Sequence, residues 1–122
     1  MIINRSNCTE AKCDEKILKY GRVRLSMKVI EQIRETIRSV FSENAKVILF
    51  GSRVQPAARG GDLDLLVIAD AARDVLARAR IQSIALLQIA LGEQHIDLVV
   101  TPNPNEDKRL VVQEAVRTGV LL

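Results

Sequence analysis

Two aspartates two residues apart are the most chemically suggestive feature of the sequence. Asp62 and Asp64 open an apolar run, Leu63 and then Leu65 to Ile68, that is typical of a buried strand. Because side chains alternate in direction along a strand, the two carboxylates point to the same side. Two like charges about 4 Å apart repel each other by about 4 kcal/mol at an effective dielectric constant of about 20. A bound cation relieves this repulsion, and oxygen-only ligands favour Mg²⁺ or Mn²⁺ over zinc.

A glycine and a serine follow the preceding apolar run. Lys46–Phe50 predicts a strand, and this strand leads directly into Gly51 and Ser52. Glycine lets a phosphate group approach the backbone closely, and serine offers the phosphate both a hydroxyl and an amide. These two residues therefore indicate a place where phosphate can bind, just before the two aspartates.

The spacing of these residues resembles that of a known family. Gly51-Ser52, a nine-residue gap and Asp62-x-Asp64 are similar to the signature of the DNA polymerase β-type nucleotidyltransferases, in which the gap is often one residue longer. The resemblance covers residues 26–122. The short length resembles the minimal nucleotidyltransferases (MNT) that act as antitoxins to small helical toxins of the HEPN type. The family has a third carboxylate on a later strand, and Asp97 supplies it here.

The resemblance implies a role for each of these residues. Asp62 and Asp64 would hold one or two Mg²⁺ or Mn²⁺ ions that bridge the triphosphate of ATP. Asp97 would complete the metal site or take the proton of the acceptor hydroxyl. The phosphates would be bound by Gly51, Ser52 and Arg53. The family's activity would then be transfer of AMP from ATP to a tyrosine hydroxyl of a HEPN-type toxin, which neutralises the toxin.

Two further basic residues have no settled role. Arg59 lies in the loop before Asp62, where it can contact the triphosphate or simply be solvated. His95 shares the direction of Asp97 by strand alternation and can approach the site. A histidine at the start of a strand without a metal partner is more often structural, so the sequence favours a structural role for His95 but leaves its role open.

Helical and strand periodicities predict the elements that position these residues. We expect an α+β fold, with a mixed sheet of at least three strands and helices packed against it. Ser26 is expected to cap the first helix, Gly92 to end the second and Asn105 to cap the third. The expected elements are helix 27–41, strand 46–50, a central strand ending at 68, helix 74–91, strand 95–101, helix 106–118 and a docked apolar tail, 120–122. Helix 74–91 is apolar over more of its surface than one packing stripe needs, which can mark a partner contact.

The positive charge of the chain is confined to its beginning. The 122 residues carry a net charge of +3, and the whole excess lies within residues 1–26. We therefore predict a basic, mobile extension over residues 1–25 and a nucleotidyltransferase domain over 26–122. The neutral body and the small number of aromatic residues, which are Tyr20, Phe41 and Phe50, argue against direct nucleic-acid binding. Without a signal peptide or an apolar run of about 20 residues, we expect a cytoplasmic protein that does not enter a membrane.

Three other functions stay open on the sequence. A nucleotidyltransferase with a small-molecule acceptor is expected to carry an additional substrate domain, for which we see no room. A non-catalytic antitoxin would neutralise its partner by binding alone, but it would have no reason to keep three mutually repelling carboxylates. A nucleic-acid adaptor would act through the basic N-terminal segment, and the neutral body argues against it.

Overall fold

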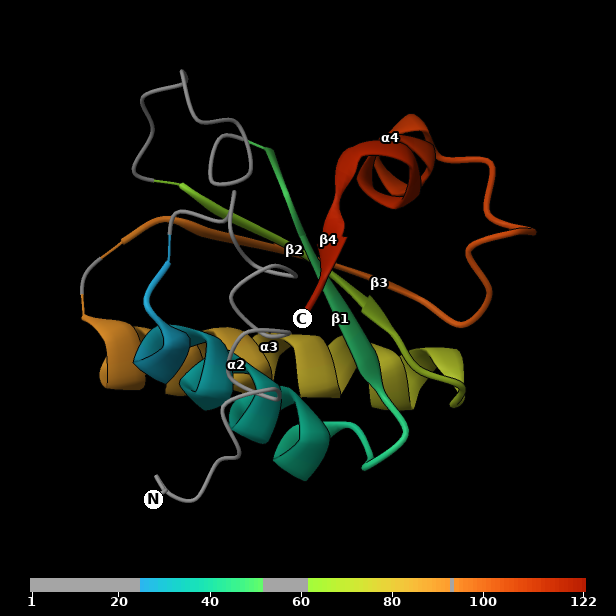
Figure 1. Ribbon diagram of the computed structural model, residues 1–122. Helices are drawn as coiled ribbons and strands as arrows, with labels where there is room; N and C mark the ends of the chain where they lie inside the picture. Colours follow the sequence, from blue (N-terminus) through green and yellow to red (C-terminus); the bar gives the residue numbers. More distant parts are fainter. Residues whose placement is uncertain (1–24, 52–61, 93) are drawn as a thin grey trace, which may run out of the picture.

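The computed structural model describes residues 25–51, 62–92 and 94–122 of the chain. Its elements are α2 (Met27–Val40), β1 (Lys46–Phe50), β2 (Leu63–Ile68), α3 (Arg73–Leu91), β3 (Ile96–Thr101), α4 (Leu110–Thr118) and β4 (Val120–Leu121), as Figure 1 shows. The predicted α+β class is confirmed. The expected extension falls outside the described residues except for Leu25. Within the described ranges, none of the helices combines the length and the apolar character that crossing a membrane requires.

The four strands form one mixed sheet in the order β3-β2-β1-β4. β2 runs parallel to β3 and antiparallel to β1, so the predicted central position of this strand is confirmed. β4 pairs with β1 at the opposite edge, where Ile48 lies across from Leu121. The backbone N–H of Leu122 donates to the carbonyl of Val47 at 2.9 Å, and the Leu122 side chain is buried. The apolar tail therefore docks on the body as predicted, and it does so as a short strand.

α2 forms as its sequence predicts. The Ser26 hydroxyl accepts a hydrogen bond from the backbone N–H of Val29 at 3.2 Å, which satisfies one of the free donors at the start of the helix. The helix ends at Val40, one residue before the predicted end. Three residues of its apolar stripe are fully buried: Ile30, Ile33 and Ile37. Burial of each side chain of this size contributes about 1.5–3 kcal/mol, so this stripe fixes α2 on the sheet.

Helices cover the two faces of the sheet unequally. α2 and α3 pack side by side against one face, whereas α4 lies on the other (Figure 1). Alternation along β2 sends Leu63, Leu65 and Val67 into the larger core, beneath α2 and α3, and Leu66 into the smaller core beneath α4. Asp64 has the parity of Leu66, so it lies on the face of the sheet that bears α4.

α3 has a buried side and an exposed apolar side. The helix begins one residue before the predicted start and ends, as predicted, at Gly92, which has a φ of 85°. Its buried residues form a narrow stripe: Leu76, Ala79, Ser83 and Leu87. In contrast, Ile81 is 66% exposed and Ile89 is 81% exposed. The broad apolar surface seen in the sequence thus includes side chains that the described part of the chain leaves in solvent.

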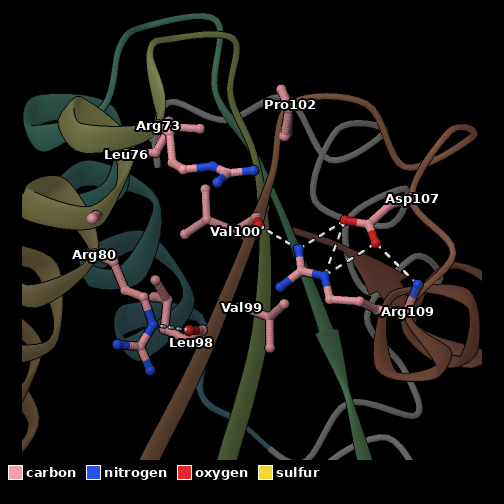
Figure 2. A pocket seen from close by; sticks show the side chains of 10 residues that line it. Arg73, Leu76, Arg80, Leu98, Val99, Val100, Pro102, Asp107 and Arg109 are labelled. Atoms are coloured by element: carbon pink, nitrogen blue, oxygen red, sulfur yellow. Dashed lines mark hydrogen bonds and ion pairs between the residues drawn. The ribbon is translucent and has the colours of Figure 1, made fainter.

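The last helix starts later than predicted. The sequence predicted a helix over 106–118, but α4 begins at Leu110. The carboxylate of Asp107 accepts a hydrogen bond from the backbone N–H of Arg109 at 3.0 Å and another from its guanidinium at 2.7 Å. Arg109 also donates to the carbonyl of Val100 at 2.8 Å (Figure 2). Side-chain bonds to nearby backbone N–H groups compete with helical bonds, which explains why residues 107–109 precede the helix instead of forming its first turn.

The Asp107 carboxylate should make this connection sensitive to acid. Hydrogen bonds from Arg109 hold the pKa of Asp107 well below its usual range. A carboxyl whose pKa is lowered by folding stabilises the folded state above the ordinary pKa, and this contribution is lost as the pH falls through the lowered value. We therefore expect Asp107→Asn to lower the free energy of unfolding at neutral pH. The deficit should shrink as the pH falls below the ordinary carboxyl pKa of 3.8.

Urea denaturation across this pH range measures both effects. Glu114→Gln is the matched control, because Glu114 belongs to an exposed pair with Arg117 whose contribution should be small. A deficit in Asp107→Asn that did not change with pH would contradict this account of the connection.

Candidate functional site

The structure brings the three predicted carboxylates to one end of the sheet. Asp64 on β2 lies directly across from Asp97 on β3 in the parallel pairing, and paired strands are about 4.8 Å apart. The two carboxyl groups are close enough to share a hydrogen bond when one of them is protonated. Asp62 lies one residue before β2, and its charge also acts on Asp64. The three acidic groups are therefore neighbours, although they come from segments that are more than 30 residues apart along the chain.

Gly51 lies against Asp64 and leaves room for its carboxylate. It follows β1, whose last residue, Phe50, pairs with Asp64. Its φ of 77° lies in the left-handed region that glycine adopts without strain. A Cβ atom at this position would collide with the Oδ2 oxygen of Asp64. Gly51 therefore brings bare backbone beside the acidic groups, where the sequence predicts phosphate. Of the other predicted phosphate ligands, Ser52 and Arg53 lie outside the described residues, as does Arg59.

His95 lies beside the acidic groups, whereas the sequence favoured a structural role and left the question open. Its Nδ1 atom lies 3.5 Å from Oδ1 of Asp62 and 4.0 Å from Oδ2 of Asp97. The imidazole is 65% exposed, so it does not fill the core. The sequence signal that could have found it was its parity with Asp97, two residues further along the chain.

The acidic groups act on one another electrostatically. The pKa of Asp64 is raised by its burial, by the charge of Asp97 and by the charge of Asp62, while His95 works in the opposite direction. Burial and like charges both disfavour an ionised carboxyl group. The ionised form of Asp64 is therefore destabilised, and an added positive charge would stabilise it.

The donor set suits a hard divalent cation, but the side chains are not drawn together around one. Three carboxylates supply only oxygen ligands, which Mg²⁺ and Mn²⁺ prefer. In the described part of the chain, no three acidic or imidazole groups converge closely enough to hold a metal ion as they stand. Asp62 and Asp97 are 59% and 56% exposed, so turning either side chain toward Asp64 displaces mainly water. By the chemistry of their oxygens and the exposure of Asp62 and Asp97, the residues fit a divalent cation.

Neutralising Asp64 should stabilise the protein in the absence of metal. Because its pKa is raised in the folded state, ionisation of Asp64 opposes folding. Stability is therefore lost as the pH rises from the ordinary value of 3.8 through the raised pKa. We expect Asp64→Asn, measured by urea denaturation with a chelator present, to have a higher free energy of unfolding than the unchanged protein at pH 7. The two should converge below the ordinary pKa.

Asp70→Asn makes the same change of charge at an exposed position beyond the far end of β2 and serves as the control. A less stable Asp64→Asn protein at neutral pH would show that the carboxylate is not held at a cost.

The collision at Gly51 can be separated from its backbone strain. Gly92 has a similar φ, 85°, but a Cβ atom there would meet nothing within 4 Å. We expect Gly51→Ala and Gly92→Ala each to lower the free energy of unfolding by about 1–3 kcal/mol, because alanine is strained at positive φ. Only Gly51→Ala should also weaken Mn²⁺ binding, measured by titration calorimetry, because only it displaces the Asp64 carboxylate. Equal Mn²⁺ affinity in the two variants would rule out this role for Gly51.

Comparison with known proteins agrees with this geometry. A family model described as a nucleotidyltransferase domain matches residues 30–120, about three quarters of the chain. The matched region contains Gly51 and the three aspartates. A search of the curated proteins found no match. From the extent of the family match, the chain belongs to the nucleotidyltransferase domain family, whose activity is transfer of a nucleotide to an acceptor.

Proposed function

We propose that this protein transfers AMP from ATP to a hydroxyl group of a partner protein, and that the partner is a HEPN-type toxin which the modification neutralises. The observation that carries the proposal is the position of Asp64, directly across from Asp97 and against the bare backbone of Gly51. The acceptor hydroxyl we propose is that of a tyrosine, as the resemblance to the minimal nucleotidyltransferases implies.

Each residue of the site has a definite task in this proposal. Asp62 and Asp64 hold the divalent cation, Mg²⁺ or Mn²⁺, and Asp97 either completes this site or accepts the proton of the acceptor hydroxyl. When bound, the cation would neutralise charge on the triphosphate. Gly51 lets a phosphate approach the backbone beside Asp64. The acceptor oxygen then forms a bond to the α-phosphorus, and pyrophosphate leaves.

The charge arrangement supports cation-dependent catalysis. Burial and the neighbouring carboxylates raise the pKa of Asp64, so the site without metal carries repulsion that metal binding removes. This relief contributes to the affinity for the cation. A carboxylate arrangement that only served stability would not place like charges side by side on adjacent strands, because like charges directly opposite each other destabilise a sheet.

The openness of the site supports a protein as the acceptor. Asp62, His95 and Asp97 all have more than half of their side-chain surface in solvent. A hydroxyl group on the surface of another protein can reach groups that are exposed in this way. We propose the exposed side of α3, which carries Ile81 and Ile89, as the surface that binds the toxin.

A transfer assay tests the proposal directly. The probe is the protein encoded by the neighbouring reading frame, which the proposal requires to be small and helical, incubated with this protein, ATP and Mg²⁺. Intact mass spectrometry of the toxin should show added AMP, and peptide mapping should place it on a tyrosine. Asp62→Asn, Asp64→Asn and Asp97→Asn should each lower the rate of transfer about 100-fold or more, because each removes charge that holds the cation or takes the proton. Asp70→Asn, with the same change of charge away from the site, should transfer at the unchanged rate.

Binding and protection separate catalysis from the non-catalytic alternative. The three site variants should still bind the toxin, because their changes lie outside the α3 surface, while Ile81→Asp should weaken binding. If the site variants still protect cells and no nucleotide is found on the toxin, the protein is an antitoxin that acts by binding alone. Transfer to a small molecule with none to the toxin would instead support a small-molecule acceptor.

A further inference from the structure

We propose that a groove along the outer edge of β3 docks an acidic, partly apolar segment of a partner protein. The groove lies between α3 and the connection that precedes α4, and its volume is about 800 Å³ (Figure 2). It follows β3 from Leu98 to Pro102, whereas the candidate site lies where β3 begins, at Asp97. The proposal goes beyond nucleotide transfer and does not depend on it.

Arginine side chains donate hydrogen bonds to backbone carbonyls at this edge. The carbonyls of His95, just before β3, and of Thr101, its last residue, accept hydrogen bonds from backbone N–H groups on the β2 side. Because carbonyls alternate in direction along a strand, those of Leu98 and Val100 face outward. Arg80 donates from Nε to the Leu98 carbonyl at 2.6 Å. Arg109, as described above, donates to the Val100 carbonyl. The two outward carbonyls of β3 that line the groove, those of Leu98 and Val100, are therefore already satisfied.

What remains along the edge is a set of hydrogen-bond donors. The backbone N–H groups of Leu98 and Val100 face the same way as their carbonyls. Arg80 uses Nε for its bond to the edge, which leaves its two terminal nitrogens for another acceptor. Arg73, from the first turn of α3, points into the same groove in Figure 2. A surface of donors with its acceptors occupied binds acceptors, and carboxylates are the strongest of these on a protein.

The charge of the groove points to the same class of ligand. Three arginines line it, Arg73, Arg80 and Arg109, and Asp107 is the one acidic residue among its lining groups. Asp107 already forms an ion pair with Arg109, with a nearest N–O distance of 2.7 Å. Arg73 and Arg80 thus present two positive charges that no acidic lining residue balances.

The floor of the groove favours a peptide over a nucleic acid. Ala77, Val100 and Pro102 give it apolar surface between the arginines. A nucleic acid bound in single-stranded form usually stacks its bases on aromatic side chains. In the described part of the chain, the two aromatic residues are Phe41, which packs against the core, and Phe50, which is 8% exposed. An acidic segment with interspersed apolar residues matches both the charged and the apolar parts of the groove.

Peptide binding to the full chain tests the proposal. The probe is the capped hexapeptide Glu-Leu-Glu-Val-Glu-Leu, and the comparison probes are the same peptide with Gln in place of Glu and a thymidine hexanucleotide. We expect the acidic peptide to bind at least about tenfold more tightly than either comparison probe at low salt. Amide resonances of Leu98 and Val100 should shift during the titration, which locates the peptide at the β3 edge.

Variants with matched charge changes complete the test. Arg73→Gln should weaken binding of the acidic peptide about two- to fivefold, and Arg73→Gln combined with Arg80→Gln about tenfold or more. Arg117→Gln removes the same charge from the exposed surface of α4, outside the groove, and should leave affinity unchanged. Arg73→Gln keeps the proposal testable if Arg80→Gln disturbs β3, because Arg73 makes no bond to the strand edge in the described structure.

Three results would overturn the proposal. Equal losses in Arg73→Gln and Arg117→Gln would show binding to net charge alone. Tighter binding of the hexanucleotide would assign the groove to nucleic acid. Unchanged Leu98 and Val100 resonances in the presence of the acidic peptide would show that nothing docks at this edge.

Discussion

The register in which β2 pairs with β3 is the constraint on which the candidate site depends. Leu63, Leu65 and Val67 are fully buried in the core beneath α2 and α3, and this fixes Asp64 on the other face. A one-residue slip of β2 would turn Asp64 into that core, where an unpaired charge costs several kcal/mol. The same alternation that builds the core therefore holds Asp64 across from Asp97.

Function and stability oppose each other at this end of the sheet. Asp64 is partly buried among like charges, and Gly51 adopts a conformation that other residues reach only with strain. Both features cost stability, and the apolar layers around β2 offset that cost. Strain and like charge of this kind are found at functional sites, where the rest of the fold offsets their cost.

Much of this architecture could be predicted from the sequence because it depends on local patterns. Alternation and helical spacing located β1, β2, β3, α2 and α3, and the Ser26 cap and the Gly92 end follow from the chemistry of single residues. The two-residue strand β4 could not be predicted, because its strand character comes from pairing with β1 and not from its own length. The start of α4 was missed because the bonds of Arg109 to Asp107 and Val100 outweigh helical propensity.

The candidate site also contains features that the sequence could predict and features that it could not. The sequence supplied the three aspartates and Gly51, and strand alternation gave the direction of the aspartate side chains. The position of His95 between Asp62 and Asp97 depends on how two parallel strands align at their beginnings, which no local pattern records. The arrangement at the edge of β3 could not be predicted either, because the hydrogen bond from Arg80 to Leu98 joins residues 18 positions apart.

The central claim is that Asp62, Asp64 and Asp97 form one divalent cation site, and a crystal structure with Mn²⁺ and a non-hydrolysable ATP analogue tests it most directly. The anomalous signal of Mn²⁺ identifies the ion independently of any assumed ligand. We expect it within ~2.0–2.6 Å of a carboxylate oxygen of Asp64 and of at least one of the other two aspartates, with triphosphate oxygens completing its coordination. Mn²⁺ and triphosphate bound elsewhere, with the three carboxylates still apart, would contradict the claim.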